Sequence, residues 1–479
     1  MTEKLRMKNT DIANLTIQEA SKLIASKQIK AKELVDLHLD RAKKLNGKLN
    51  AFITICEDGI YQQAEKIDHL IAQGQKLNPL AGIPIGVKDL YSTKDIKTTA
   101  GSKVLENYIP VYDATAITKL KDANAVVIGK TNLDAWGHGS SGENSDFGPT
   151  KNPYDLSRVP GGSSSGSGAA VAASTCLAAT GTDTGGSLRF PAAFCNVVGL
   201  KPTYGRVSRY GVIAMASSLD SIGHLTKTVY DNALFLNVTA GSDPLDATTA
   251  SIRVDNYTLE IEKGIRNLKI GLPKEYFSKL DKEIKKATLT AVNKLETLGA
   301  KVEEISLPHT EYAVAAYYII QPSEVSSNLA RYDGIRFGFG REKFGAEAKR
   351  RIILGSFTLS SGYYDAYYLK AMKVRRLIKE DFDKAFGKID AIICPTSPTL
   401  PFKLGEKVND PLQMYLSDIF VVSQNLAGVP SLNAPCGFIN GLPVGMQIVG
   451  PHFSEKLLYQ VGYAYEQETK WYERKPELT

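Results

Sequence analysis

Two clusters rich in serine and glycine, at 161–167 and 182–187, contain the residue types that nucleophilic chemistry requires. A third segment, 83–89, lies upstream and contains Lys88. A serine hydroxyl attacks an amide carbon only when a base takes its proton, and no histidine accompanies these serines. Lys88 is the nearby candidate base, because a lysine that acts through a second serine can support acyl transfer without histidine.

The surroundings of these residues suit that chemistry. Glycine-rich turns let several backbone N–H groups point at one spot, so the turn 184–187 can supply an oxyanion hole. A helix that begins near Ser167 would add its positive N-terminal end. Lys88 acts as a base only when it is neutral. Its apolar neighbours in the segment 83–87 indicate burial, which disfavours the charged form.

Three other interpretations of the serine-glycine region stay open at this point. A flexible linker conflicts with Asp183, Arg189 and the apolar run between the clusters. A phosphate-binding loop lacks the required lysine after its last glycine. Residues 162–166 fit the nucleophile-elbow pattern formally, but Pro160 and a glycine precede them where that motif needs a strand.

The whole chain of 479 residues has an ordinary globular composition, with 43% hydrophobic and 23% charged residues. It lacks a run of the roughly 18 apolar residues that a membrane span needs. Residues 1–5 contain no apolar signal segment, so we expect a cytoplasmic protein without membrane association. The five cysteines are scattered and suggest buried free thiols rather than a metal site. The net charge of +7 is mild and gives little support to a nucleic-acid surface.

Apolar periodicity predicts a chain that alternates between helices and strands. Thr16 and Glu19 form a capping-box pattern before an N-terminal helix, and a second helix follows over 31–45. Further helices are expected over 115–121, 281–298 and 366–386, and strands over 125–128, 268–272, 301–305, 390–394 and 444–449. This order is typical of an α/β fold, with a central mixed sheet covered by helices.

The domain organisation follows from the same pattern. We expect an N-terminal helical segment, residues 1–60, packed on a single large domain, residues 61–479. The polar, glycine-containing stretch 323–362 is expected to be an irregular excursion from the sheet rather than a domain of its own.

Taken together, Lys88 and the clusters 161–164 and 183–187 resemble the amidase signature family. The resemblance implies the amidase signature fold and a triad of serine, cis-serine and lysine. Ser187 is then the nucleophile that forms a covalent acyl-enzyme, Ser163 is the bridging serine on a cis peptide, and Lys88 is the base. The oxyanion hole implied by the resemblance consists of the backbone N–H groups of Thr184, Gly185, Gly186 and Ser187.

Motifs along most of the chain resemble one branch of this family, the A subunits of the glutamyl-tRNA(Gln)/aspartyl-tRNA(Asn) amidotransferases. These motifs lie at 130–134, 142–145, 147–150, 152–153, 197–209, 217–220, 362–368 and 425–430. The resemblance implies a glutaminase that hydrolyses glutamine and passes ammonia to a partner. The partners would be the B and C subunits of a heterotrimer, with mischarged Glu-tRNA(Gln) bound mainly through the B subunit. ATP and Mg²⁺ would act in the partner, and this chain would need no cofactor or metal.

The same resemblance places glutamine recognition at Arg351 and Asp418, with Tyr318 nearby. A guanidinium pairs with an α-carboxylate through two parallel hydrogen bonds, and a carboxylate accepts from an α-ammonium. Arg350 is the alternative to Arg351, since both lie in a basic run that can also form a solvated helix face. Asp418 can alternatively serve as a helix cap.

Four positions depart from the family pattern around the site. Ser165 stands where we expect glycine, Phe190 and Ser221 where we expect glutamine, and His224 where we expect proline. Two other functions also stay open: a free-standing amide hydrolase of the same fold, and a non-catalytic tRNA-binding or scaffold protein. The presence of Lys88, Ser163 and Ser187 together argues against the second. The sequence leaves open whether Glu-tRNA(Gln), Asp-tRNA(Asn) or both are served.

Overall fold

The computed structural model describes residues 13–278, 280–335 and 339–478. Residues 1–5, on which the expectation of no signal segment depends, lie outside the described residues. So do residues 336–338 of the expected polar excursion.

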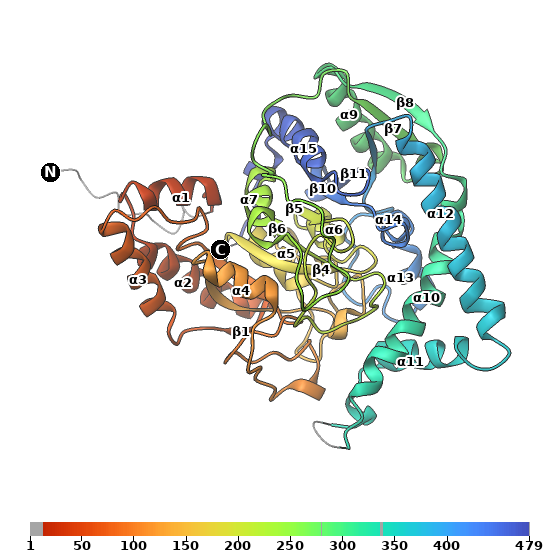
Figure 1. Ribbon diagram of the computed structural model, residues 1–479, viewed down its shortest axis with the longest axis horizontal. Coiled ribbons are helices and arrows are strands. Elements are labelled where there is room, and N and C mark those ends of the chain that lie inside the picture. Colours follow the sequence, from red (N-terminus) through yellow and green to blue (C-terminus); the bar gives the residue numbers. More distant parts are fainter. Residues whose placement is uncertain (1–12, 279, 336–338, 479) are drawn as a thin grey trace.

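An eleven-stranded mixed sheet runs through the described residues, in the order β1-β3-β2-β4-β6-β5-β10-β11-β9-β7-β8 (Figure 1). Strand β2 is parallel to β3 and β4, β7 is parallel to β8 and β9, and the remaining neighbours are antiparallel. The predicted fold class, a mixed sheet covered by helices, is therefore confirmed. The strands are β1 (Phe52–Ile55), β2 (Pro84–Lys88), β3 (Val126–Thr131), β4 (Ala178–Asp183), β5 (Val198–Lys201), β6 (Ser221–Thr226), β7 (Lys269–Pro273), β8 (Lys301–Ile305), β9 (Ala391–Pro395), β10 (Ser431–Ile439) and β11 (Leu442–Val449).

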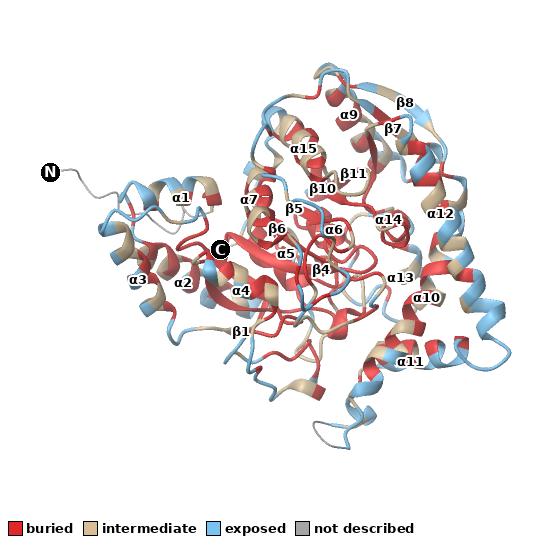
Figure 2. Cartoon of the chain, in the orientation of Figure 1, coloured by how far each residue is buried: buried red, intermediate tan, exposed pale blue. Residues whose placement is uncertain are grey.

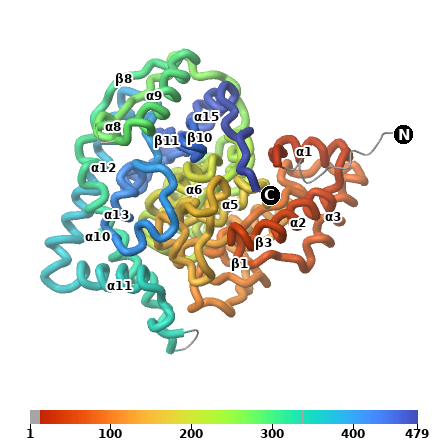
Figure 3. Tube along the Cα trace, turned by 180° about the vertical axis from the view of Figure 1, so that it is seen from behind, coloured from red at the N-terminus to blue at the C-terminus, as the bar shows by residue number. Residues whose placement is uncertain are grey.

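Helices surround this sheet. Helices α1–α3 gather at one end of the molecule and α10–α12 at the opposite end, as the front and rear views both show (Figures 1 and 3). The helices are α1 (Ile17–Ala25), α2 (Ala31–Leu49), α3 (Ile60–Ala72), α4 (Thr115–Asp122), α5 (Ser165–Ala172), α6 (Arg189–Phe194), α7 (Val229–Thr239), α8 (Lys274–Phe277), α9 (Lys282–Thr297), α10 (Ala313–Asn328), α11 (Ala346–Thr358), α12 (Lys370–Phe386), α13 (Pro411–Leu416), α14 (Val422–Ala427) and α15 (Glu455–Thr469). None of the helices in the described residues is long and apolar enough to cross a membrane.

Most predicted elements are found close to their expected bounds. The capping box of α1 forms as predicted, because Thr16 accepts from the Glu19 N–H and the Glu19 carboxylate accepts from the Thr16 N–H. Strand β8 matches its predicted range, and α9 begins one residue after its N-cap Asp281. The helix expected over 366–386 starts as a π-helical turn, Tyr364–Leu369, before α12.

The stretch 323–362 is largely helical, so the expectation of an irregular excursion is wrong for its described residues. It contains the end of α10 and the whole of α11, which pack against each other. Gly355 allows this close approach, because a Cβ atom there would collide with the carbonyl of Pro322. A glycine that looks like a loop signal in the sequence is here a packing residue between two helices.

The core lies in the sheet and in the two short helices that pack directly on it. Every residue of α5 and of α6 is buried (Figure 2). The small side chains of α5 fit this crowded position, since Gly166 packs against the Ala51 carbonyl and Gly168 against Pro191. This packing fixes the N-terminal end of α5, where the serine cluster lies.

The N-terminal residues are tied to the same core. Strand β1 extends the sheet by pairing with β3, from Phe52 opposite Thr131. Helix α1 is held at its first turn by the Asp231 carboxylate, which accepts from the N–H groups of Ile17 and Gln18.

Candidate active site

Lys88 is the last residue of β2 and lies fully buried at the edge where neighbouring parallel strands end. Its Nζ atom donates to three hydroxyl oxygens: Ser163 Oγ at 2.8 Å, Ser164 Oγ at 2.9 Å and Thr182 Oγ1 at 2.7 Å. Because β2 and β4 are parallel neighbours, their carboxyl ends bring Lys88 beside Thr182. The sheet thus joins the two serine-glycine clusters at one lysine.

The environment of Lys88 favours its neutral form. Burial lowers the pKa of Lys88 to about 7, while the charges of Asp134, Asp183 and Asp220 partly oppose this shift. Among the described residues, no carboxylate lies within ion-pair distance of Nζ. A large fraction of neutral amine is therefore present near neutral pH, and that amine can accept a proton from a hydroxyl.

Ser163 follows a cis peptide bond between Gly162 and Ser163, as the resemblance implied. Gly162 has no room for a side chain, because a Cβ atom there would collide with the Asp134 carboxylate. That carboxylate accepts from the N–H groups of Gly142 and Asn144 and is fully buried. Burial raises the pKa of Asp134 to about 6.

Ser187 lies in the turn that follows β4, and Asp183 organises this turn. Asp183 Oδ1 accepts from the Gly186 N–H at 2.8 Å, and Oδ2 accepts from the Leu188 N–H at 3.1 Å. Arg189 donates to both carboxylate oxygens from Nε and Nη2, at 3.0 and 2.9 Å. Burial alone raises the pKa of Asp183, but the charge and hydrogen bonds of Arg189 outweigh it and hold the pKa below its usual range.

The expected oxyanion donors are not equivalent in the structure. The Gly186 N–H is already bound to Asp183, so an oxyanion would have to share it. In the part of the chain that the structure describes, the N–H groups of Thr184, Gly185 and Ser187 have no acceptor. Thr184 anchors the turn through its hydroxyl, which donates to Asp220 at 2.6 Å. Of the four expected donors, only the Gly186 N–H is thus engaged within the protein, and those of Thr184, Gly185 and Ser187 are not.

Tyr317 is a neighbour of this turn that the sequence did not suggest. A Cβ atom at Gly185 would collide with the Tyr317 phenol, so the ring covers the turn from the side of α10. The ring is buried, and its neighbour Tyr318 lies edge-on to it with ring centroids 5.1 Å apart. The only sequence signal was the tyrosine pair itself.

The structure brings Tyr318, Arg351 and Asp418 together. The Tyr318 hydroxyl donates to Asp418 Oδ2 at 2.6 Å, and the Arg351 guanidinium carbon lies 5.6 Å from the centre of the Tyr318 ring. Ser140 donates to Asp418 Oδ1 at 2.7 Å. Both charged side chains are buried, and burial raises the pKa of Asp418 to about 6.

The structure also separates Arg351 from its neighbour Arg350. Arg350 has a side chain that is 39% exposed, whereas that of Arg351 is 4% exposed, so only Arg351 belongs to the buried cluster. Arg351 is held by Glu347, which accepts from Nε at 2.8 Å, and by Gln321, which accepts from Nη1 at 2.9 Å. Neither of these partners was predicted from the sequence.

The departures from the family pattern lie around the site without entering the lysine cluster. His224 is buried in β6 and shares a 2.7 Å hydrogen bond with the Thr239 hydroxyl. Ser165 donates to Thr150, and the Phe190 ring packs against Gly186. Ser221 is buried at the start of β6.

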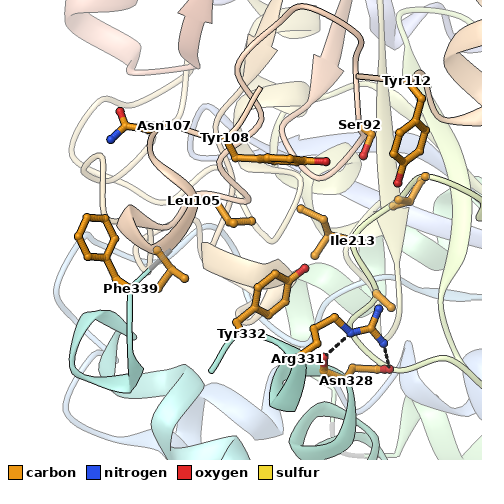
Figure 4. A pocket seen from close by; sticks show the side chains of 14 residues that line it. Ser92, Leu105, Asn107, Tyr108, Tyr112, Ile213, Asn328, Arg331, Tyr332 and Phe339 are labelled. Atoms are coloured by element: carbon orange, nitrogen blue, oxygen red, sulfur yellow. Dashed lines mark hydrogen bonds between the residues drawn. The ribbon is translucent and has the colours of Figure 1, made fainter. Parts of the chain in front are cut away.

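Two adjoining cavities open beside the site. The larger, of about 960 Å³, is bordered by aromatic side chains such as Tyr108, Tyr332 and Phe339 (Figure 4). The smaller, of about 260 Å³, reaches Thr182 and Asp220, which contact Lys88 and Thr184 respectively. The two cavities share the lining residues Val212, Ile213, Ala214 and Arg331.

The arrangement can perform acyl transfer through a serine without histidine. It places Lys88, whose pKa is lowered to about 7, against the Ser163 hydroxyl and beside a turn with unpaired N–H donors. Within the described residues, no group of three or more His, Cys, Asp or Glu side chains is arranged to hold a metal ion.

Comparison with known proteins agrees with this chemistry. Residues 33–459 match the model of the Amidase family. The A subunit of the glutamyl-tRNA(Gln) amidotransferase of Carboxydothermus hydrogenoformans is 53% identical over 97% of this chain and 99% of that protein. A crystal structure of the A subunit of glutamyl-tRNA(Gln) amidotransferase from Thermotoga maritima is 44% identical, with a TM-score of 0.83 and 95% of each chain covered. The peptide amidase of Stenotrophomonas maltophilia is 31% identical, with a TM-score of 0.83 over 97% of this chain and 99% of that one.

Proposed function

The chain belongs to the amidase family, and from this premise we propose that it is the glutamine-hydrolysing A subunit of a tRNA-dependent amidotransferase. The observation that carries the proposal is the contact of Lys88 with Ser163 beside the turn that bears Ser187. It occurs in a chain that is about half identical, along nearly its whole length, to proteins named as the A subunit of glutamyl-tRNA(Gln) amidotransferase.

We propose that Ser187 attacks the carboxamide carbon of glutamine. Neutral Lys88 takes the proton of Ser163, and Ser163 takes the proton of Ser187 as its Oγ bonds to carbon. The N–H groups of the turn, chiefly those of Thr184, Gly185 and Ser187, stabilise the developing oxyanion, while Gly186 shares its N–H with Asp183. Ammonia leaves with a proton returned through the same residues, and water then cleaves the acyl-enzyme to glutamate.

Substrate recognition is assigned to the buried cluster beside the turn. Arg351 pairs with the α-carboxylate of glutamine, Asp418 accepts from its α-ammonium, and Tyr318 orients Asp418. A buried carboxylate and a buried guanidinium that do not pair directly with each other fit a zwitterionic ligand.

The ammonia is proposed to leave through the two adjoining cavities. The smaller cavity reaches Thr182 and Asp220 at the site, and it shares four lining residues with the aromatic cavity. In this proposal the B and C subunits complete a heterotrimer with this chain in the cytoplasm. The B subunit uses ATP and Mg²⁺ to activate Glu-tRNA(Gln) and amidates it, and Asp-tRNA(Asn) is a second candidate substrate. We propose that the catalytic unit is the large domain 61–479, with the described part of the N-terminal segment, residues 13–60, packed on it and joined to its sheet through β1.

The experiment compares wild-type and Ser187→Ala complexes that contain all three subunits. With glutamine as donor, Ser187→Ala should form no Gln-tRNA(Gln), while added ammonium should restore its formation because amidation occurs elsewhere. An acyl-enzyme trapped in the wild type should map to Ser187. An assembled Ser187→Ala complex that uses glutamine normally, or that fails with ammonium, contradicts the proposed division of labour.

A second candidate function is a free-standing amide hydrolase. The 31% identity to a peptide amidase of the same fold, over nearly the whole of both chains, favours it. This candidate predicts that the purified chain alone hydrolyses simple amides as fast as the assembled complex does. The proposed function predicts instead that glutamine is preferred and that the partners increase its hydrolysis.

A further inference from the structure

The buried cation Arg351 is held by contacts that extend well beyond its own helix. Glu347 and Arg351 lie one turn apart on α11, so their side chains share a face. Glu347 Oε1 accepts from Arg351 Nε at 2.8 Å, and the same oxygen accepts from the Tyr415 hydroxyl at 3.1 Å. A residue of α13 therefore holds the carboxylate that orients the arginine of α11.

Tyr415 is also connected to the opposite end of the recognition cluster. Its ring stacks on that of Tyr318, with centroids 3.8 Å apart and planes 21° from parallel. The Tyr318 hydroxyl donates to Asp418, and the Asp418 N–H donates to the Tyr415 carbonyl at 3.1 Å. The short segment 415–418 thus contains both Tyr415, which bonds to Glu347, and Asp418, the carboxylate at the opposite end of the recognition cluster.

These contacts form a continuous chain that runs from Arg351 through Glu347, Tyr415 and Tyr318 to Asp418. The guanidinium lies over both tyrosine rings, 5.6 Å from one centroid and 5.8 Å from the other. Within the described residues, Nη2 of Arg351 makes no hydrogen bond to the protein, so it stays available to a ligand. This chain of contacts fixes the separation between the Nη2 edge of the Arg351 guanidinium and the carboxylate of Asp418.

We propose that Tyr415 and Glu347 are positioning residues that set Arg351 at the distance from Asp418 which the α-carboxylate and α-ammonium of an L-amino acid require. The inference rests on the proposed function and deepens it. Neither residue touches the reacting atoms. They act through Arg351, because a guanidinium that can rotate freely loses the alignment on which two-pronged pairing depends.

The test is steady-state kinetics of the complete complex with Tyr415→Phe, which removes the hydroxyl and keeps the stacked ring. KM for glutamine should rise about 10-fold or more, the usual cost of a lost hydrogen bond to a charged group, with kcat nearly unchanged. Hydrolysis of a neutral amide, propionamide, should keep its kcat/KM, because that molecule carries neither charged group. Tyr312→Phe, at a tyrosine that is 49% exposed, is the matched control and should alter nothing.

Glu347→Gln provides a second variant that keeps an oxygen acceptor for Arg351 and Tyr415 and gives up the acceptor of Arg350, and it should raise KM less than Glu347→Ala does. An unchanged glutamine KM in Tyr415→Phe overturns the inference. So does an equal loss on propionamide, which would indicate a purely structural role, or a KM that falls in Glu347→Gln, which would mean that Glu347 competes with substrate. A wild-type complex that leaves glutamine intact refutes the proposed function itself, and this outcome is separate because it is measured before any variant.

Discussion

Lys88 Nζ lies 2.8 Å from Ser163 Oγ, so a residue at the end of β2 contacts the residue that follows a cis peptide 75 positions later. The effect expected from replacing Lys88 follows from this contact. Among the described residues, Lys88 Nζ bonds to three hydroxyls and pairs with no carboxylate, which separates it from lysines that serve as partners in ion pairs.

Replacing Lys88 should remove the base, so that Ser187 can no longer be deprotonated through Ser163. Lys88→Ala should lower kcat for glutamine by about 10²–10⁴-fold, the usual worth of a general base, and more if the triad acts as a unit. Lys88→Arg should not restore activity, because arginine stays protonated. Rates are compared with those of His69→Ala and His309→Ala, which should remain active. A histidine variant as inactive as Lys88→Ala, with normal folding, would mean that the base has been named wrongly.

The pH dependence should report two buried groups. Lys88 must be neutral to act, so kcat/KM should rise as the pH increases through about 7. Asp418 must be ionised to bind an α-ammonium, so KM should rise as the pH falls through about 6. In Asp418→Asn, the second dependence should disappear while the first remains. A profile that is flat between about pH 5.5 and 8.5 would count against both assignments.

Glutamine recognition should depend on charge at both ends of the cluster. Arg351→Ala and Asp418→Ala should each weaken transition-state binding of glutamine by about 2–5 kcal/mol, because each leaves a buried polar cluster incomplete. Propionamide hydrolysis should change little in either variant. Arg376→Ala is the matched control, since its side chain is 76% exposed and pairs with Glu380 rather than with the cluster. Equal effects at 351 and 376 would remove Arg351 from the site.

Much of the outer architecture is predictable from the sequence, because periodic apolar residues and caps act locally. The helix after Thr16, α9 after Asp281 and strand β8 all obey such rules. Strands β4 and β6 were missed, since the sequences Ala178–Asp183 and Ser221–Thr226 contain small and polar residues with no alternation. Both strands are buried on both faces, and burial of that kind depends on distant neighbours.

The site shows the same division between local and distant information. The motifs predicted Lys88 and Ser163, which the structure brings into contact, and Ser187 in the turn after β4, because chemistry restricts those residue types. They gave no sign of Tyr415 or Glu347, whose positions depend on how α13 meets α11 across 68 residues of chain. The use of the Gly186 N–H by Asp183 could not be predicted either, since it depends on the hydrogen-bond geometry of a single turn.

The adjoining cavities predict a separation of hydrolysis from ammonia delivery. Ile213 lines both cavities and is visible in the larger one (Figure 4), so Ile213→Trp should obstruct the passage between them. Glutamate formation should persist, while the ratio of Gln-tRNA(Gln) to glutamate should fall. Leu259→Trp, at an exposed leucine, should leave the ratio unchanged. An unaltered ratio in Ile213→Trp would exclude this route.

A buried ion pair, Asp183 with Arg189, lies beneath the turn that bears Ser187. Asp183 and Arg189 are both fully buried, and Arg189 also donates to Gln447, Asn425 and the Val421 carbonyl. Asp183→Asn leaves an uncompensated guanidinium, which should lower the free energy of unfolding by about 3–5 kcal/mol in urea titrations at about pH 7.5.

The difference in free energy of unfolding between the wild type and Asp183→Asn should become smaller as the pH falls. The pKa of Asp183 is depressed in the folded chain, so its contribution is complete above the unfolded pKa of about 4 and declines as the pH falls below it. Asp255→Asn, at an exposed position, should match the wild type throughout. Because Asp183 also holds the Gly186 and Leu188 N–H groups, folded Asp183→Asn should form the Ser187 acyl-enzyme more slowly. Full stability with full acylation would show that the turn keeps its shape without this carboxylate.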